Sequence, residues 1–375
     1  MKDSWTDEGF RDTVREKGRE MVTKTFTPLF LKNLQLPNRI VFAPFETNYA
    51  TEEGVPTQKQ IDHYARIADG GAGFIIVEAT NINPEPRSKA TPFGLCLYED
   101  RFIAPLSKLA EKIHSLGAKA ALQIVDKTFK ATQKKPADAT VDEIGRIVEY
   151  FVEGTARARS AGFDAVDYHW AHSYTVADFL SKRGNNRRDE YGRTLEGRMR
   201  MAVAILKRAR EKVGKDFPLI CRISGDEFIL GGNTTLHGIA ISQKFAQEGA
   251  DMIDVSTAGR IDDGPDSYSR ERGSPTLDFP DGCNVHVAEA IRKAAKIPVI
   301  TVGKIRTPTL IEEILQEEKA DLVALGRPLF ADPLFPRKAQ EGRWEEIISC
   351  QCCNTCHRLY LSDKPVECAL RMKKK

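Results

Sequence analysis

The sequence predicts an α/β fold in which eight parallel strands close into a (β/α)8 barrel, the TIM barrel. Eight short apolar segments recur along the chain, with helical patterns between them. Each segment is nearly continuous in apolar residues, as expected for parallel strands that are covered on both faces. The strand–helix alternation repeats eight times, and the 375 residues exceed the about 250 that one such barrel needs.

The elements can be placed in order along the chain. Thr140 and Glu143 predict a capping box before a helix that ends near Ala161. Pro308 suits the first turn of a helix that continues over Thr309–Gln316. An open doubly wound sheet is the alternative fold, but no Gly-x-Gly-x-x-Gly follows the first strand. The predicted strands are Ile40–Ala43, Phe74–Glu78, Ala120–Val125, Ala165–Tyr168, Leu219–Ile223, Met252–Val255, Val299–Val302 and Leu322–Leu325.

Both ends of the chain depart from the barrel pattern. We expect an N-terminal extension over residues 1–25, the barrel over 26–345, and a short Cys-rich segment over 346–375 packed on the barrel. Within the extension, Phe10, Val14 and Met21 fall on one face of a short helix laid across the barrel. A partly ordered extension is the alternative.

Composition excludes several classes of function. The chain carries 56 basic and 53 acidic residues, a net charge of +3, with no basic patch interleaved with aromatic residues. No segment approaches the about 18 apolar residues of a membrane span, and the N-terminus lacks the apolar core of a signal peptide. We therefore expect a cytoplasmic protein that acts on a small molecule and binds neither nucleic acid nor membrane.

Titratable side chains gather directly after the fourth predicted strand. His169, His172 and Tyr174 follow Tyr168, the last residue of that strand. Packing alone seldom requires three such side chains at a strand end. The carboxyl ends of the strands are where barrel enzymes keep their chemistry, so we interpret this group as catalytic. A hydrogen-bonded histidine pair beside a polar loop is the alternative.

The stretch from Gly162 to Arg198 resembles the signature of the old yellow enzyme family of flavin oxidoreductases. In that family the strand is followed by His-x-x-His or His-x-x-Asn, a tyrosine, and Asn-x-Arg-x-Asp-x-Tyr-Gly. The resemblance extends over about Phe26 to Cys368 and implies FMN as cofactor, with NADH or NADPH as reductant. The residues in register are His169, His172, Tyr174, Asn185, Arg187, Asp189, Tyr191 and Gly192.

The resemblance also implies roles for the strand-end group. His169 and His172 would hold a carbonyl or nitro oxygen of the substrate, which favours the charge that develops during hydride transfer. Tyr174 would then protonate the α-carbon.

Candidates for the phosphate of FMN follow the last two predicted strands. Gly303 follows the seventh strand, and Gly326 and Arg327 follow the eighth. These loops form the common phosphate site of TIM barrels, where glycine lets backbone N–H groups approach the ligand and arginine adds a bidentate contact. Turn glycines with a surface arginine are the alternative interpretation.

Two polar residues inside predicted strands are candidates for the flavin ring. Arg222 lies within the fifth strand, where a charge needs a partner. The resemblance places it beside flavin N1, and a buried ion pair with Asp226 or Glu227 is the alternative. Gln123 of the third strand would offer its amide to the pyrimidine edge of the ring.

The first strand leads into Ala43-Pro44-Phe45-Glu46, which is similar to the family's Ala-Pro-Met followed by threonine or cysteine beside flavin O4 and N5. Phe45 replaces the methionine, and Glu46 holds the position of the threonine or cysteine. A carboxylate there would lower the potential of the flavin unless it is protonated or turned away. Ala79, after the second strand, matches a small residue that packs near the flavin.

Two further departures concern the walls of the substrate site. Trp170 replaces a residue that is usually small, and we expect it to narrow or redirect the pocket. After Gln123, relatives continue toward His-x-Gly-Arg, whereas this chain has Val125-Asp126-Lys127-Thr128-Phe129. We therefore expect substrate-side walls that differ from those of well-studied members.

Five of the eight cysteines lie between Cys350 and Cys368. Their spacing, C-x2-C-x2-C-x11-C, resembles the [4Fe–4S] segment of larger members such as trimethylamine dehydrogenase, dienoyl-CoA reductase and enoate reductases. Zinc also accepts four thiolates, and a metal-free remnant is the third alternative. His357 or Cys352 would be a substitute ligand. The candidate ligands are Cys350, Cys353, Cys356 and Cys368.

In the larger members the cluster exchanges electrons between FMN and a partner that binds FAD. This chain stops at Lys375 without such a domain. We therefore expect that a separate protein donates electrons, that NAD(P)H reduces FMN directly, or that the cluster is vestigial. A homo-oligomer stays open.

The sequence thus predicts an FMN-dependent oxidoreductase that passes hydride from NAD(P)H to an electron-poor alkene such as an enone or enoyl thioester. One alternative is amine dehydrogenation, with Trp170 and Phe45 in an aromatic cage for a cationic amine. Another is a flavin-binding redox protein with a decayed substrate site, which Glu46 and the altered segment after Gln123 suggest. A metal-dependent barrel hydrolase is disfavoured, because no carboxylate–histidine cluster marks the strand ends.

Overall fold

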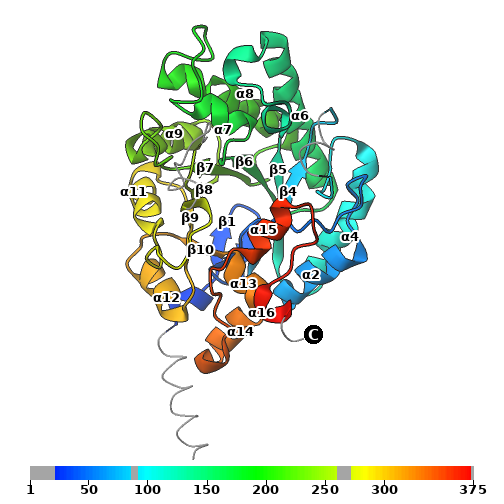
Figure 1. Cartoon of the computed structure of the whole chain (residues 1–375), viewed down its shortest axis with the longest axis vertical. Helices are drawn as coiled ribbons and strands as arrows, with labels where there is room; N and C mark the ends of the chain where they lie inside the picture. Colours follow the sequence, from blue (N-terminus) through cyan, green and yellow to red (C-terminus); the bar gives the residue numbers. More distant parts are fainter. Residues whose placement is uncertain (1–21, 86–91, 260–271, 373–375) are drawn as a thin grey trace, which may run out of the picture.

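A computed structural model describes residues 22–85, 92–259 and 272–372 of the chain. Eight parallel strands close into a barrel in the order β10-β3-β4-β5-β6-β7-β8-β9, and helices surround it (Figure 1). The predicted TIM barrel is therefore confirmed, and the open-sheet alternative is wrong. The strands are β3 Ile40–Phe42, β4 Phe74–Asn81, β5 Lys119–Val125, β6 Ala165–Trp170, β7 Leu219–Ser224, β8 Met252–Ser256, β9 Val299–Val302 and β10 Leu322–Leu325.

Each predicted strand forms, and the largest differences lie at the ends of β4 and β6. β4 continues to Asn81 because the ladder with β5 shifts register between Val77 and Thr80 and then resumes. β6 continues to Trp170, which is paired with Ile223 of β7. Pairing with the neighbouring strand therefore extends both strands beyond their continuous apolar runs.

The helices begin where the sequence places their caps. The Thr140 hydroxyl accepts a hydrogen bond from the Glu143 amide, and the capping box opens α6 as predicted. Pro308 occupies the first turn of α12. The helices are α2 Gln58–Asp69, α4 Ile103–His114, α5 Thr128–Thr132, α6 Val141–Ser160, α7 Thr175–Leu180, α8 Leu195–Val213, α9 Thr235–Gln247, α11 Val285–Ala295, α12 Pro308–Gln316, α13 Arg327–Ala331, α14 Phe335–Gln340, α15 Thr355–Leu361 and α16 Ala369–Met372.

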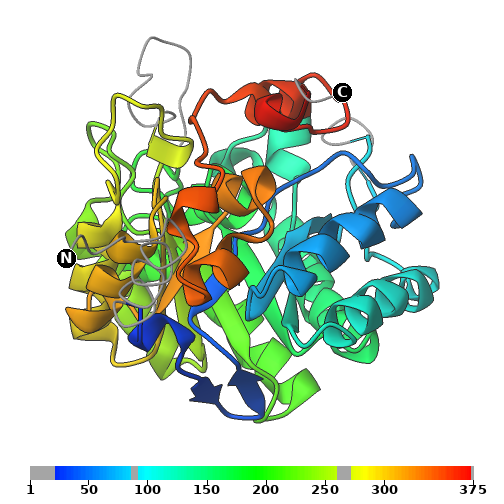
Figure 2. The ribbon, with the colours of Figure 1, turned by 90° about the horizontal axis from the view of Figure 1, so that it is seen from below.

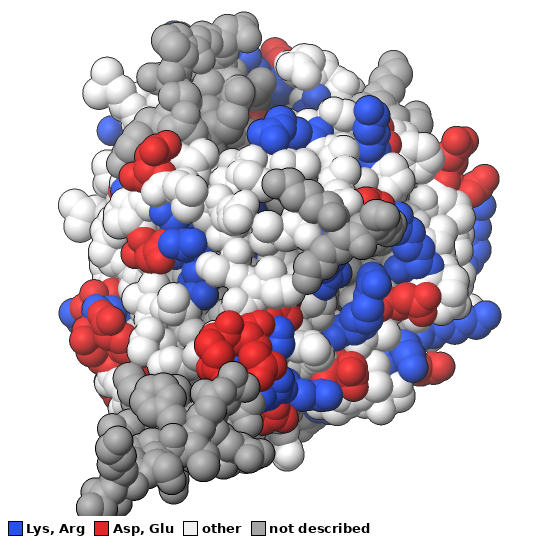
Figure 3. Space-filling model, turned by 60° about the horizontal axis from the view of Figure 1, so that its bottom comes forward, with Lys and Arg blue, Asp and Glu red and all other residues white. Residues whose placement is uncertain are grey.

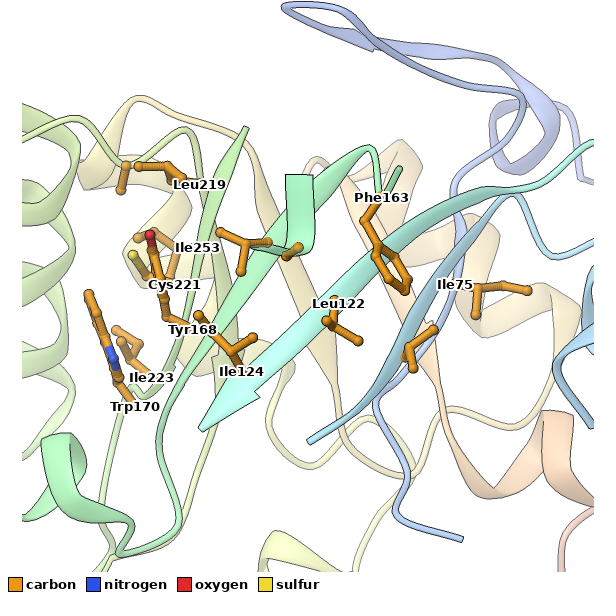
Figure 4. Packing of buried hydrophobic residues seen from close by; sticks show 14 of the residues in the cluster. Ile75, Leu122, Ile124, Phe163, Tyr168, Trp170, Leu219, Cys221, Ile223 and Ile253 are labelled. Carbon is orange, nitrogen blue, oxygen red and sulfur yellow. The ribbon is translucent and has the colours of Figure 1, made fainter. Parts of the chain in front are cut away.

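The strands bury apolar side chains on both faces. Outward-facing residues such as Leu122, Tyr168 and Ile223 pack beneath the helices (Figure 4). Inward-facing residues such as Ile76 and Met252 fill the barrel itself. Two separate apolar layers therefore hold the strand ends in fixed positions.

A hairpin closes one end of the barrel. Strands β1, Leu29–Leu31, and β2, Leu34–Leu36, pair antiparallel, and Leu34 and Leu36 are buried against the inner layer. The C-terminal helices α15 and α16 lie at the opposite end, which Figure 2 shows clearly. That opposite end is the one toward which the carboxyl ends of the strands point.

The segment that follows the barrel is tied to the loop after β3. Asn48 donates hydrogen bonds to the carbonyls of Tyr360 and Lys364, at 3.0 and 3.1 Å. The amide of Val366 donates to the carbonyl of Thr47 at 2.9 Å. α15 is therefore held across the carboxyl end of the barrel (Figure 1).

On the face seen in Figure 3, acidic and basic side chains are interspersed. This agrees with the nearly balanced charge of the sequence. Among the described helices, none is long and apolar enough to cross a membrane. The predicted helix with Phe10, Val14 and Met21 lies outside the described residues.

Candidate active site

A cavity of about 670 Å³ opens at the carboxyl ends of the strands. Its volume falls within the range of sites that bind cofactors and drug-sized ligands, about 300–1,000 Å³. The structure brings every residue predicted for catalysis or flavin binding to its wall. These residues are Ala43, Pro44, Phe45, Glu46, Ala79, Gln123, His169, His172, Tyr174, Arg222, Gly303, Gly326 and Arg327.

The two histidines lie together at the end of β6. His172 Nδ1 is 3.4 Å from His169 Nε2, and its Nε2 forms a 2.7 Å hydrogen bond with the Ser256 hydroxyl. Burial lowers the pKa of His172 to about 3, and nearby Arg222 contributes. Burial and His172 also hold the pKa of His169 well below its usual value. Both imidazoles are therefore neutral at physiological pH and retain one N–H donor each.

Backbone geometry turns this group toward the cavity. His172 and Ser173 have φ values of 58° and 61°, a left-handed conformation that non-glycine residues seldom adopt in succession. The turn brings the ring of Tyr174 to 4.7 Å from that of His169, centroid to centroid. Tyr174 also packs against Ala79 and Val125, which fixes its position on the wall.

Glu46 is neither protonated nor turned away from the cavity. Its Oε1 atom pairs with Lys127 Nζ at 2.5 Å, and the Lys127 side chain is only 2% exposed. Its Oε2 atom accepts hydrogen bonds from the hydroxyls of Tyr360, at 2.5 Å, and Tyr174, at 3.4 Å. Burial opposes ionisation, but Lys127 and Tyr360 together lower the pKa of Glu46 below its usual value. A neighbouring lysine therefore offsets the carboxylate.

Arg222 is ion-paired inside the barrel, but with a residue that the sequence did not suggest. Its Nη1 atom donates to Asp254 Oδ2 of the adjacent strand β8 at 2.7 Å. Asp226 instead accepts hydrogen bonds from Thr235. Glu227 binds the Asn233 amide and the Ser181 hydroxyl, so the pairing proposed with either of these two residues is wrong.

A second buried carboxyl lies beside this pair. Asp167 of β6 accepts a 2.6 Å hydrogen bond from the amide nitrogen of Gln123. Burial raises the pKa of Asp167 well above its usual value, and the charge of Asp254 raises it further. One guanidinium therefore faces one carboxylate and one carboxyl group that tends to stay protonated.

The polar atoms of Arg222 and Gln123 that have no partner within this group fit a flavin ring. Arg222 Nε is buried and has no hydrogen-bond partner among the described residues. The amide nitrogen of Gln123 is committed to Asp167, which leaves its oxygen as an acceptor. A free donor and a free acceptor complement the carbonyl and N–H groups of a pyrimidine edge.

The phosphate candidates line the same cavity on the side of β9 and β10. Gly303 has φ of 137°, and a Cβ atom there would lie 2.6 Å from Asn284 Nδ2, so glycine is required. Arg327 Nη1 forms a 2.5 Å hydrogen bond with Asn354 Oδ1 of the C-terminal segment. The residues present therefore fit FMN, although their individual roles stay predictions.

No three of the four predicted cluster cysteines are placed together to bind a metal, although Cys356 and Cys368 pack in the same apolar cluster. Cys350 lines the cavity, Cys353 is exposed, and Cys356 is buried against Phe330 and Val366. The part of the chain that the structure describes holds no group of three or more His, Cys, Asp or Glu residues placed to bind a metal. The iron–sulfur, zinc and metal-free alternatives for these cysteines therefore stay predictions.

Trp170 does not shape the cavity, contrary to expectation. It lies on the outer face of β6, where its ring stacks on Tyr168 with 4.8 Å between centroids. Phe151 and Phe245 enclose it, and only 1% of its surface is exposed. Because side chains alternate along a strand, Trp170 must face away from the side that His169 occupies.

Several residues of the site were not expected from the sequence. Asp167 and Asp254 are carboxylates inside apolar strands, the same pattern that singled out Arg222. Lys127 differs from the family pattern in the sequence, but nothing in the sequence indicates that it pairs with Glu46. Nothing in the sequence indicates that Tyr360 belongs to the site, because it reaches the cavity from a distant part of the chain.

Comparison with known proteins agrees with this geometry. Residues 24–346 match the NADH:flavin oxidoreductase / NADH oxidase family. The chain is 40% identical over 344 residues to an NADH oxidase of Thermoanaerobacter brockii, an alignment that covers 86% of this chain and 51% of that protein. It is 35% identical over 336 residues to an NADPH dehydrogenase of Halalkalibacterium halodurans, covering 85% and 94%.

Among solved structures, a 2-naphthoyl-CoA reductase in complex with 2-naphthoyl-CoA superposes with a TM-score of 0.84. The match covers 92% of this chain and 56% of that one, at 24% identity, which supports the fold alone. This chain spans about half the length of the NADH oxidase that it resembles.

Proposed function

The chain belongs to the NADH:flavin oxidoreductase / NADH oxidase family, and from this membership we propose that it reduces electron-poor carbon–carbon double bonds. The substrate would be an enone or an enoyl thioester, with NADH or NADPH as the direct electron donor. The observation that carries the proposal is the joint placement of His169, His172 and Tyr174 on one wall of the cavity. A separate donor protein and a homo-oligomer stay predictions.

Bound FMN would supply the hydride that it receives from the nicotinamide cofactor. The neutral imidazoles of His169 and His172 would donate hydrogen bonds to the substrate oxygen, where negative charge develops. Burial and the nearby Glu46 raise the pKa of Tyr174 well above its usual value, so its hydroxyl keeps its proton until the α-carbon accepts it.

The charge of the cavity wall argues against a cationic amine substrate. Among the described residues that line it, Glu46 is the one carboxylate, and Lys127 already neutralises it. Lys130 and five other lysine or arginine side chains line the same cavity. Trp170, proposed for an aromatic cage, is buried elsewhere. The complete histidine–histidine–tyrosine set also argues against a decayed substrate site.

The test is turnover by the full chain after reconstitution with FMN. Under anaerobic conditions we expect oxidation of NADH or NADPH that depends on 2-cyclohexenone, with the saturated ketone as product. Tyr174→Phe should slow this reaction, whereas Tyr150→Phe, on the outer helix α6, should not. Failure to bind flavin, or bleaching of bound flavin by amines but not by NAD(P)H, would contradict the proposal.

A further inference from the structure

We propose that Glu46 is a proton carrier in this site and returns to Tyr174 the proton lost on alkene reduction, with Tyr360 as its source. The inference rests on the proposed function. It adds two residues to the histidine–histidine–tyrosine set, and one of them comes from the C-terminal segment.

The first observation is that one carboxylate oxygen joins two tyrosines. Glu46 Oε2 accepts hydrogen bonds from Tyr360 at 2.5 Å and from Tyr174 at 3.4 Å. All three side chains line the cavity. Such contacts in ligand-free sites are often long and tighten when substrate binds. The chain thus holds a continuous hydrogen-bonded route from one hydroxyl to the other.

The second observation is that the carboxylate is held in place. Lys127 binds the other oxygen of Glu46 at 2.5 Å and is almost completely buried. A buried ion pair of this kind is costly to break, so the carboxylate keeps one orientation. Besides Lys127, two charged groups interact with Glu46. One is Lys130 of α5, and the other is Glu78 of β4, which accepts a hydrogen bond from the hydroxyl of the adjacent residue Thr47.

The third observation is that the residues next to Glu46 hold Tyr360 in position. The Thr47 carbonyl accepts the amide of Val366, and Asn48 donates to the carbonyl of Tyr360 itself. The loop that carries the carboxylate therefore also fixes the segment that carries the second tyrosine. These hydrogen bonds fix the distance between Glu46 and Tyr360.

The proposed step is balanced as follows. Hydride adds to the β-carbon, and the electron pair of the double bond forms a C–H bond at the α-carbon with the proton of Tyr174. The Glu46 carboxylate accepts the proton of the Tyr360 hydroxyl and passes it to the Tyr174 phenolate, which leaves Tyr360 as the phenolate and Glu46 ionised again. Water then reprotonates Tyr360. Because burial and Glu46 raise the pKa of Tyr174, its phenolate is a strong base that draws this proton back.

The experiment separates the first turnover from later ones in the FMN-loaded full chain. Tyr360→Phe keeps the ring but removes the hydroxyl. When the pre-reduced variant is mixed with 2-cyclohexenone, the first turnover should match the wild-type rate, since Tyr174 already carries its proton. Steady-state turnover should then fall about 10-fold to 100-fold after a burst of one product per site, below the about 10²–10⁴ of a direct proton donor.

Controls and a second measurement keep the proposal open to refutation. Glu289→Gln removes a carboxylate paired with Lys293 at 2.6 Å on the outer helix α11 and should change neither phase. If Tyr360→Phe slows both phases equally, or neither, the proposal is wrong. A wild-type chain without alkene reduction would refute the proposed function instead.

Tyrosine titration in the near ultraviolet tests the hydrogen-bonded route without turnover. Glu46→Gln replaces the carboxylate with a neutral amide. It should therefore lower the pH at which Tyr174 and Tyr360 ionise, because the charge of Glu46 raises the pKa values of both. An unchanged titration would show that Glu46 does not link these hydroxyls and would overturn the proposal.

Discussion

Three buried residues, Arg222, Asp254 and Asp167, allow a quantitative prediction. If Asp254 is replaced, we expect Asp167 to take its place as the ionised partner of Arg222. Arg222 is 7% exposed and Asp254 is fully buried, with 2.7 Å between the paired atoms. Removing one partner of a buried ion pair normally costs about 3–5 kcal/mol, because the remaining charge is left uncompensated. Here a second carboxyl group, Asp167, lies beside the pair, and burial and the charge of Asp254 keep its pKa high.

In Asp254→Asn, burial still raises the pKa of Asp167, but the charge of Asp254 no longer adds to it and Arg222 lowers it, so Asp167 ionises more readily opposite Arg222. We therefore expect a loss of only about 1.5 kcal/mol in the free energy of unfolding, the value of one hydrogen bond to a charged group. Asp167→Asn alone replaces a carboxyl group that tends to stay protonated with an amide of the same shape, for about 0.5 kcal/mol. The double variant leaves Arg222 alone and should lose about 4 kcal/mol.

The assay is urea denaturation at neutral pH, followed by circular dichroism, for the wild type, both single variants and the double variant. The double-mutant cycle should show a coupling energy of about 2 kcal/mol, with the double loss exceeding the combined single losses. Additivity within about 0.5 kcal/mol would refute the compensation argument. So would an Asp254→Asn loss as large as that of the double variant.

Three further outcomes are expected. Tyr174→Phe should slow alkene reduction by about 10²–10⁴, whereas reduction of the flavin by NAD(P)H, followed by stopped-flow absorbance, should be unchanged. If both half-reactions slow, Tyr174 is not the proton donor. Gly303→Ala should weaken FMN binding and cost about 1–3 kcal/mol in urea denaturation, because φ is 137° and the new methyl group meets Asn284; a variant with wild-type affinity would place the phosphate elsewhere. Burial raises the pKa of Glu78 from 4.5 to about 7, so the unfolded chain ionises first and the free energy of unfolding should fall by about 3 kcal/mol as pH rises across that interval. Glu78→Gln should flatten this dependence in urea denaturation at several pH values, and an unchanged slope would assign it to other groups.

The barrel and much of the cavity wall were predictable because local pattern determines them. Strands covered on both faces need continuous apolar runs, and the ends of parallel strands meet at one edge of the barrel. The residues just after those runs must therefore converge. His169 and Arg327 lie far apart in sequence, yet both positions followed from this rule.

Partners across strands were not predictable from local pattern. Asp226 and Glu227 are closest to Arg222 in sequence, but the residue opposite Arg222 is set by the register of β7 with β8, which pairs it with Asp254. Local pattern misplaces Trp170, because the continuous apolar run of this strand ends at Tyr168, before the strand itself does. Once β6 continues, the alternation that puts His169 inside puts Trp170 outside. Tyr360 depends on how a distant segment folds back over the barrel.

The hairpin of β1 and β2 has a consequence for the order of events during turnover. Because Leu34 and Leu36 seal the floor of the barrel, the cavity is reached from the opposite side, where α15 already lies across it. In the proposed reaction, a nicotinamide donor and an alkene acceptor would enter through this same opening and would bind one after the other. Double-reciprocal plots of the initial rate against alkene concentration, at several fixed concentrations of the nicotinamide donor, should give parallel lines. An excess of either reactant should inhibit binding of the other.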